Sequence, residues 1–317
     1  MHMHANSATG SMKRVLQLSV VATTLYVVAT LVYGLRAHSL ALISEAGHNA
    51  SDVVALLLSA VAVQFQARPA DERRTFGYGR AGVLAAFLNA ITLVLLSIWI
   101  GYLAIVRFLQ PVTVQPRIMM VVAAIGVLMN GVIAALLWKQ AHDVNIRGAF
   151  LHMLSDTLST AAVILGGAAI AFTGLQWIDP LLSLGIAVLI LWSSIGIVRE
   201  TLNILLEGTP VGVPLHDVRL AMQAVEGVTE VHDLHIWSVN AGAHALASHV
   251  TIGDVAMVES ERILQDMLDV LRMQFGILHA TIQFERKGCP TENGCSGIPT
   301  GDVTVHAHHH HGATCSH

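Results

Sequence analysis

The stretch ALISEAGHNASDVVALLLSAVAVQF, residues 41–65, decides the fold, because it is mostly apolar yet includes Glu45, His48 and Asp52. A helix of about 20 apolar residues crosses the roughly 30 Å hydrocarbon layer of a membrane. An ionisable side chain inside such a span is costly unless it faces a partner or water, so it is expected only where a function requires it. The stretch therefore predicts a membrane-spanning helix that carries a functional polar face.

The same polar spacing occurs a second time in the chain. Asp52 follows His48 by four residues, and Asp156 follows His152 by four residues. This step places both side chains of each pair on one face of a helix. Two such helices side by side offer two imidazole nitrogens and two carboxylates to a common point, which suits the tetrahedral geometry of Zn²⁺. A single pair would indicate packing, whereas two copies predict a metal site inside the membrane.

Further apolar stretches of sufficient length predict a transmembrane domain of six helices. The chain is 54% hydrophobic and 12% charged, about half the charge of a typical soluble domain. This composition excludes an ordinary water-soluble enzyme. The alternative, that the stretches are buried helices of a large soluble protein, is disfavoured because some of those helices would need a polar face toward water. The predicted spans run over residues 15–35, 41–65, 81–108, 118–138, 149–173 and 178–198.

The distribution of Lys and Arg predicts the orientation of these spans. Segments that hold Lys13 and Arg14, or the several Arg between residues 68 and 80, alternate with segments that hold few basic residues. By the positive-inside rule, both termini of this multi-pass protein are expected on the cytoplasmic side of the cell (inner) membrane. No cationic segment with a cleavage site precedes the first span, so we expect no signal peptide. The net charge of −4 excludes nucleic acid as a partner.

The predicted ligands also indicate an energy source. A histidine must be neutral and an aspartate ionised to bind metal, so metal ions and protons compete for the same atoms. We therefore expect metal to be exchanged for protons. Glu45, three residues before His48, is either an exit ligand or a helix-end carboxylate that faces water, and we favour the second interpretation. Asn89 and Asn130 are expected to form hydrogen bonds between helices.

Beyond Glu200 the sequence becomes that of an amphipathic soluble protein. Its pattern predicts the order α-β-β-α-β, which suits a small α+β, ferredoxin-like sandwich with helices on one face of the sheet. His232, His249 and His279 fall on neighbouring predicted strands with Glu285, so we expect a second metal site there. The predicted elements are a helix over 215–226, strands over 228–239 and 243–252, a helix over 257–275 and a strand over 278–285.

From about Lys13 to Glu285 the chain resembles the cation diffusion facilitators, a family of metal efflux carriers that includes a zinc-type branch. The resemblance implies six spans, a cytoplasmic ferredoxin-like domain, homodimers joined through that domain, and exchange of Zn²⁺ for H⁺. It also implies that the two His-Asp pairs form the transport site of the zinc-type branch, since the manganese branch has Asp at the His positions. Besides those pairs, the matching stretches are RRTFGYGR (73–80), WIDP (177–180), LLEG (205–208), HDLHIW (232–237) and TIQFE (281–285).

The same resemblance implies ligands in the soluble part. The three strand histidines and Glu285 correspond to the metal ligands of the family's cytoplasmic domain. Cys289 and Cys295 are similar to a cysteine pair that adds ligands in zinc-type relatives, although their spacing is wider, and His235 is expected to serve the fold. We expect no metal site in the loop over 69–74, which has no histidine. A flexible tail for metal capture, or alternatively an expression tag, is predicted from His306, His308, His309, His310 and His311.

Taken together, these patterns predict a secondary active transporter that exports divalent cations in exchange for protons, with Zn²⁺ as the first candidate and Co²⁺, Cd²⁺ or Ni²⁺ as further ones. The alternative is a membrane-bound metal sensor or metalloenzyme. A hydrolytic zinc site needs an open position and a general base, and the chain has neither His-Glu-x-x-His nor an ATP-binding glycine-lysine loop, so no enzyme is expected. The predicted parts are a cytoplasmic tail (1–14), the transport domain (15–205), a metal-binding and dimerisation domain (206–287) and a Cys/His-rich tail (288–317).

Overall fold

The computed structural model describes residues 5–138, 144–240 and 242–286. The chain forms two compact units, one that comprises the residues up to Gly208 together with Val239–Gly242, and one that comprises Thr209–Ser238 and the residues from Ala243 onward. The first unit is helical and the second combines helices with a sheet, as the change of sequence character near Glu200 predicts. Cys289, Cys295 and the histidines of the C-terminal tail lie outside the described residues.

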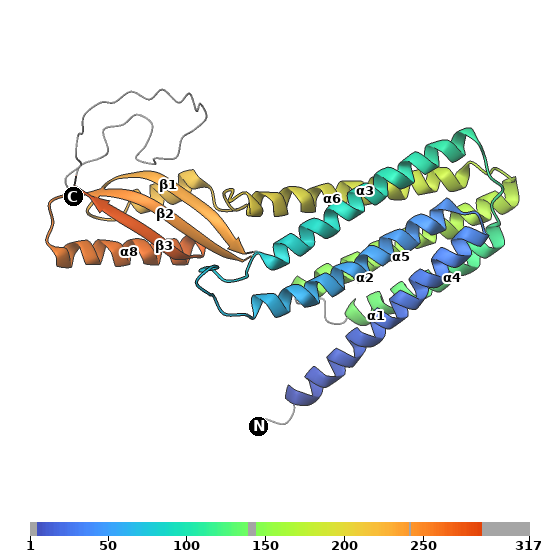
Figure 1. Ribbon diagram of the computed structural model, residues 1–317, viewed down its shortest axis with the longest axis horizontal. Coiled ribbons are helices and arrows are strands. Elements are labelled where there is room, and N and C mark those ends of the chain that lie inside the picture. Colours follow the sequence, from blue (N-terminus) through green and yellow to red (C-terminus); the bar gives the residue numbers. More distant parts are fainter. Residues whose placement is uncertain (1–4, 139–143, 241, 287–317) are drawn as a thin grey trace. The chain divides into compact units, whose positions relative to one another are not determined.

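The first unit consists, within its described residues, of six helices (Figure 1). Five of them are long and apolar enough to cross a membrane, and the sixth, α1, has a shorter apolar part over Val20–Arg36. The predicted helical membrane domain is therefore confirmed. The helices are α1 (Ala5–Arg36), α2 (Leu40–Gln66), α3 (Ala81–Leu109), α4 (Pro116–Trp138), α5 (Val144–Thr173) and α6 (Ile178–Leu205).

Three helix ends differ clearly from the predicted spans. Helix α1 begins at Ala5 rather than at residue 15, α5 begins at Val144 rather than at residue 149, and α6 continues to Leu205 rather than ending near residue 198. The prediction followed the apolar residues alone. Polar residues such as Arg199 and Glu200 have good helix propensity, so the helix continues beyond the segment that suits lipid.

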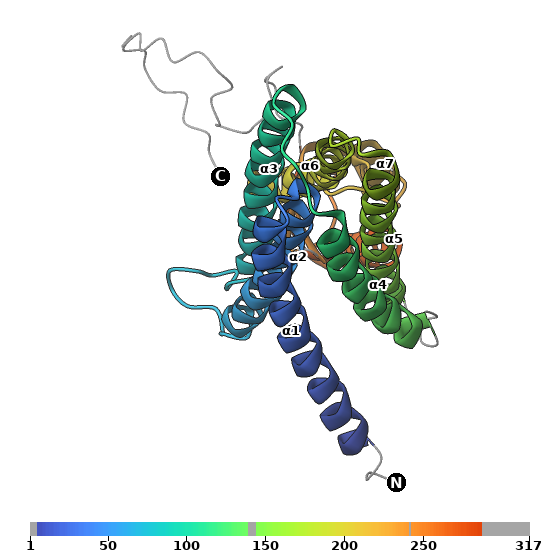
Figure 2. The same ribbon diagram turned by 90° about the vertical axis from the view of Figure 1, so that its right-hand side faces the viewer.

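The helices of the first unit pack as neighbouring pairs. Helix α3 runs along α6 and α4 runs along α5, while α2 contacts α1, α3, α5 and α6 (Figure 2). Small residues permit the close approach of α5: a Cβ on Gly166 would lie 2.0 Å from Leu182 Cδ1 of α6, and one on Gly167 would lie 2.8 Å from Met120 Cγ of α4. Between α2 and α3, Ser51 donates a hydrogen bond to Asn89 Oδ1 at 3.1 Å, which confirms the interhelical role predicted for that asparagine.

The start of α2 is anchored to α6 by the buried Asp179. The Ser39 hydroxyl donates to Asp179 Oδ1 at 2.6 Å, and the Leu40 backbone N–H donates to Asp179 Oδ2 at 2.7 Å. Ser39 also accepts a hydrogen bond from the Leu42 N–H, so it caps α2 in the usual way for a serine. Arg107 of α3 lies 3.8 Å from the same carboxylate. This anchor fixes the helix that carries His48 and Asp52.

The second unit has the predicted order α-β-β-α-β. Its elements are α7 (Leu215–Gln223), β1 (Val228–Asn240), β2 (Ala243–Ile252), α8 (Met257–Phe275) and β3 (Ile277–Glu285). The strands form one sheet in the order β1-β2-β3, with β2 and β3 parallel and joined through α8. Helix α8 ends at Gly276, whose φ of +65° suits glycine at a helix C-terminus.

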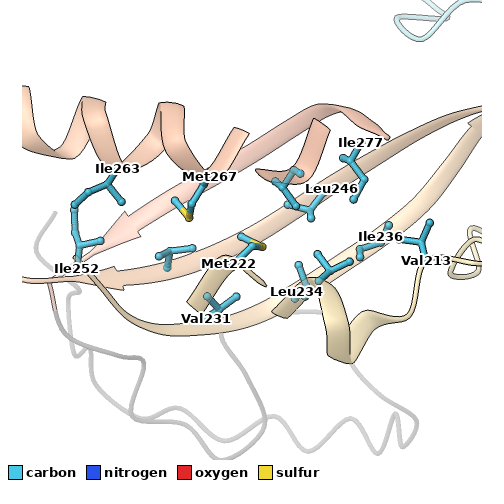
Figure 3. Packing of buried hydrophobic residues seen from close by; sticks show 13 residues of the cluster. Val213, Met222, Val231, Leu234, Ile236, Leu246, Ile252, Ile263, Met267 and Ile277 are labelled. Carbon is cyan, nitrogen blue, oxygen red and sulfur yellow. The ribbon is translucent and has the colours of Figure 1, made fainter. Parts of the chain in front are cut away.

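The core of the second unit lies between the sheet and its helices. Met222 of α7 and Met267 of α8 are fully buried, and they pack with Leu234 and Leu246 of the strands (Figure 3). The buried residues of β1 alternate with exposed or half-buried ones, as expected for a strand with one covered face. Polar side chains on the remaining positions are therefore free to form a site on the sheet.

Candidate metal sites

The paired His-Asp motifs converge between α2 and α5. His48 Nε2 lies 3.8 Å from Asp52 Oδ2 on its own helix and 3.3 Å from Asp156 Oδ1 on the other. His152 Nε2 lies 3.5 Å from Asp52 Oδ2 and 3.5 Å from Asp156 Oδ2. Each carboxylate therefore contacts both imidazoles.

One ligand atom from each of His48, Asp52 and Asp156 lies within 4.8 Å of the others, and His152 lies beside this group of three, within 3.5 Å of both carboxylates. With metal to ligand distances of about 2.0–2.2 Å, neighbouring ligand atoms of a tetrahedral zinc site lie roughly 3.3–3.5 Å apart. The measured separations of 3.3 to 3.8 Å between nitrogen and oxygen are close to this value. The two imidazole rings meet edge to face with their centroids 6.1 Å apart. Because the rings are not stacked on each other, they leave space for an ion between them.

The four side chains differ in exposure. Asp156 is 5% exposed, His48 21% and Asp52 25%, whereas His152 is 46% exposed. The buried end of the group therefore lies at Asp156 and its open side at His152.

Glu45 is not a helix-end carboxylate that faces water, so that interpretation is wrong. The residue is only 1% exposed, and its Oε1 accepts a hydrogen bond from Asn49 Nδ2 at 3.3 Å and lies at hydrogen-bond distance from the Thr160 hydroxyl of α5. The reason is the anchoring of α2 by Asp179, which buries the first turns of the helix. No pattern within residues 41–65 indicates this anchor, because Asp179 lies far away in the sequence.

A second group of ligand-type side chains lies on the sheet of the second unit. Glu285 Oε2 is 3.1 Å from His232 Nε2, and Glu285 Oε1 is 2.9 Å from His249 Nδ1. One ligand atom from each of these three residues lies within 4.8 Å of the others. All three are partly buried, and the two rings meet edge to face at 5.7 Å. The arrangement can hold one cation with further positions open to other ligands.

His279 is not brought to this group within the chain. It lies on β3 six residues before Glu285, and in the parallel register it pairs with Ala245 whereas Glu285 pairs with Thr251. Six residues of strand span roughly 20 Å, which is far beyond the reach of a shared ion. Its separation from Glu285 along one strand is the signal that could have indicated this placement.

Asp233 is a neighbour of this site that the sequence analysis did not select. Its Oδ2 lies 3.9 Å from His249 Nε2, and its Oδ1 lies 3.0 Å from His235 Nε2. Its φ of +48° is uncommon for a residue other than glycine, although aspartate tolerates it better than most. This local turn of the backbone places the carboxylate beside the site and links it to the exposed His235.

In the loop between α2 and α3, the carboxylate of Asp71 accepts hydrogen bonds from the loop itself. Asp71 Oδ1 accepts hydrogen bonds from the N–H groups of Arg73 and Arg74, both at 2.8 Å, and Oδ2 accepts one from the Tyr78 hydroxyl at 3.0 Å. These donors, led by Tyr78, lower the pKa of the Asp71 carboxyl. Arg80, which follows this loop, pairs with Glu207 at 3.1 Å. The residues of the RRTFGYGR stretch (73–80) therefore form hydrogen bonds and an ion pair that stabilise the loop and its junction with α3.

Comparison with known proteins matches both units. Residues 16–206 match the family model of the cation efflux transmembrane domain, and residues 210–287 match that of the cation efflux protein cytoplasmic domain. A Bacillus subtilis (strain 168) protein named cadmium, cobalt and zinc/H(+)-K(+) antiporter is 36% identical over 309 residues, which cover 96% of this chain and 99% of that protein.

Two further similarities concern a transporter and a separate domain. The zinc transporter ZitB of Escherichia coli (strain K12) is 35% identical over 289 residues, which cover 90% of each chain. A solved structure described as the metal-bound C-terminal domain of the CzcD transporter from Cupriavidus metallidurans is 38% identical and covers 23% of this chain and 99% of that one, with a TM-score of 0.22.

Proposed function

Because this chain belongs to the cation efflux family, we propose that it is a secondary active transporter that exports divalent metal cations from the cytosol in exchange for protons. Its relatives bear the names of a cadmium, cobalt and zinc antiporter and of a zinc transporter. Zn²⁺ is the first candidate substrate, with Cd²⁺, Co²⁺ and Ni²⁺ as further ones. The proposed location is the inner membrane, with both termini in the cytosol.

The observation that carries this proposal is the contact of each site carboxylate with both site imidazoles. Each imidazole nitrogen lies 3.3 to 3.8 Å from an oxygen of each carboxylate, and with His152 added to the group of His48, Asp52 and Asp156 these side chains would supply a tetrahedral set for a borderline-soft ion such as Zn²⁺. A complete set leaves no position for an activated water, which argues for carrying an ion rather than for hydrolysis. A membrane-bound sensor or metalloenzyme is therefore the weaker candidate.

Proton exchange follows from the same ligands. His48 and His152 bind metal only as neutral imidazoles, and each lies within 3.8 Å of two carboxylates. A proton and a divalent cation thus compete for each ring. Where the pH is lower, protons displace the ion, and the return of the protonated carrier brings protons into the cytosol.

The second unit is proposed to bind metal and to join two copies of the chain. His232, His249 and Glu285 would hold an ion at the sheet, with Asp233 beside it. An ion there is a regulatory or structural ligand of the cytoplasmic domain, separate from the transported one. The proposed parts of the chain are an N-terminal tail (1–14), the transport domain (15–205), the cytoplasmic domain (206–287) and a C-terminal tail (288–317) whose histidines capture metal.

A flux measurement tests the proposal. The full-length protein is reconstituted into proteoliposomes, a pH gradient is imposed, and uptake of Zn²⁺ is followed with a fluorescent indicator together with the internal pH. We expect zinc and protons to move in opposite directions, and we expect Asp156→Ala to abolish both. Asp254→Ala is the matched control, because Asp254 is 81% exposed and pairs only with Arg286 among the described residues. Equal flux in Asp156→Ala and in the unaltered protein would refute the assignment of the site.

A further inference from the structure

Beside the transport site lies a buried polar group that the four metal ligands do not explain. Glu45 of α2 is 1% exposed and Thr160 of α5 is fully buried. Thr160 follows Asp156 by four residues and Glu45 precedes His48 by three, so both lie about one helical turn from the metal ligands. The contact between Glu45 and Thr160 therefore joins α2 to α5 at the level next to the site.

The hydrogen bonds of Thr160 determine which form of Glu45 fits this contact. The Thr160 hydroxyl oxygen lies at hydrogen-bond distance from Glu45 Oε1 and 2.7 Å from the backbone carbonyl oxygen of Asp156. A hydroxyl has one hydrogen, and an ionised carboxylate and a carbonyl both only accept. With an ionised Glu45, Thr160 would have to share its one hydrogen between both acceptors; each contact is a full hydrogen bond when Glu45 carries a proton on Oε1 and donates it to Thr160, which then donates to the Asp156 carbonyl.

The burial of Glu45 leads to the same protonation state. Its Oε2 is buried and forms no hydrogen bond, and no Lys or Arg of the described residues forms an ion pair with it. An ionised carboxylate without a cation partner is very costly in an apolar interior, whereas the neutral acid costs far less. Asn49 adds one donor, and its Nδ2 also bonds the Glu45 carbonyl oxygen at 2.9 Å.

The helices pack closely around Thr160. A Cβ on Gly126 of α4 would lie 2.0 Å from the Tyr26 hydroxyl of α1 and 3.1 Å from Thr160 Cγ2. Tyr26, Thr160 and the glycine backbone of α4 therefore meet closely inside the first unit. Among the described residues, the only other side-chain hydrogen bond between α5 and α2 is the one that joins Asp156 to His48 within the site.

We propose that Glu45 is a positioning residue of the transport site, a neutral carboxylic acid that holds Thr160 and thereby the Asp156 turn of α5 against α2. It is neither a ligand of the ion nor a charged group of the exchange. The inference rests on the proposed transport function, since the geometry that it maintains is that of the four ligands. Groups that orient metal ligands typically change affinity about 10- to 100-fold when they are removed.

Two substitutions at Glu45 separate a neutral donor from a charged group. Glu45→Gln keeps the size and a donor but cannot be ionised, so zinc flux, its KM and its pH profile should stay within about threefold of the unaltered protein, well under the effect of losing such a group. Glu45→Ala and Thr160→Val remove the contact and should raise KM for Zn²⁺ about 10- to 100-fold with little change in kcat. Ser44→Ala is the matched control, because this buried serine bonds only the Leu40 carbonyl of its own helix among the described residues.

Infrared spectroscopy of the metal-free protein gives a readout that does not depend on transport. We expect the band of a protonated carboxylic acid in the unaltered protein and in Ser44→Ala, and a loss from that band in Glu45→Gln. Loss of flux in Glu45→Gln equal to that in Glu45→Ala, or an unchanged infrared band, would overturn the inference. Absence of zinc flux in the unaltered protein would instead refute the proposed function and leave the infrared result to decide the state of Glu45.

Discussion

Asp156 Oδ1 lies 3.3 Å from His48 Nε2, although the two residues are 108 positions apart in the sequence. This contact joins α5 to α2. A second contact joins the same helices the other way round, because Asp52 Oδ2 of α2 lies 3.5 Å from His152 Nε2 of α5. Each helix supplies one imidazole and one carboxylate, so the proposed ligand set is shared between α2 and α5 and would be separated if the two helices moved apart.

Replacing a site imidazole by a carboxylate should change which metal is carried. In His48→Asp the ligand set becomes one nitrogen and three carboxylates, and oxygen ligands favour harder ions such as Mn²⁺ over Zn²⁺. We expect the ratio of zinc to manganese flux to fall at least about tenfold, a shift of roughly 1.4 kcal/mol. Competition between the two ions in proteoliposomes measures this ratio. An unchanged ratio would show that ligand type at His48 does not set selectivity, and Ser44→Ala serves as the control.

The anchor between α2 and α6 should contribute strongly to stability. In Asp179→Ala, the Ser39 hydroxyl and the N–H groups of Leu40 and Ala41 lose a fully buried acceptor. Removing one partner of a buried ion pair, here Asp179 beside Arg107, typically costs about 3–5 kcal/mol of folding free energy. We expect a clear decrease in the thermal unfolding temperature of the protein in detergent.

Ser194→Ala is the matched control for Asp179→Ala. Ser194 is buried on the same helix, and its hydroxyl forms no hydrogen bond within the described part of the chain, so its removal should change the unfolding temperature little. If both variants unfold at the temperature of the unaltered protein, Asp179 does not anchor α2.

The sequence predicted the helices and the strands well, and the structure brings the two predicted His-Asp pairs together, for a physical reason. Apolar length marks a span, and polar residues inside a span are so costly that two His-Asp pairs indicate a shared site. The burial of Glu45 escaped prediction because it depends on Asp179, a contact between distant parts of the chain that no local pattern encodes.

The site on the sheet was predictable only in part. The strand pattern places His232 and His249 on neighbouring strands, but which residues lie side by side depends on the register of the strands, which the pattern does not give. His279 therefore falls beside Ala245 and not beside the ligand group. Asp233 escaped selection because its backbone conformation, with φ of +48°, departs from the regular strand that the pattern predicts.

The loop between α2 and α3 should show an acid titration governed by Tyr78. Because its folded-state pKa is lowered, Asp71 contributes stability that is present above its unfolded pKa near 3.9 and is lost as the pH falls through the lowered value. Tyr78→Phe removes the leading donor to this carboxylate while the ring remains. We expect the pKa of Asp71, followed by NMR of isotope-labelled aspartate carboxyls, to rise toward the ordinary value. A pKa that does not move would assign the shift to the backbone donors of Arg73 and Arg74 instead.

The three-residue group on the sheet should bind metal through Glu285. This carboxylate contacts both histidines, at 3.1 Å and 2.9 Å, so Glu285→Gln removes the only negative ligand of the group and should weaken metal binding at least about tenfold. The measurement uses the full chain in an Asp156→Asn background, which suppresses binding at the transport site, with Zn²⁺ titrated against a competing indicator. His216→Ala is the control, because His216 is an exposed histidine on α7. Equal zinc affinity in Glu285→Gln and its parent would show that Glu285 is not a zinc ligand. Its contacts with the two histidines would then be ordinary ion pairs.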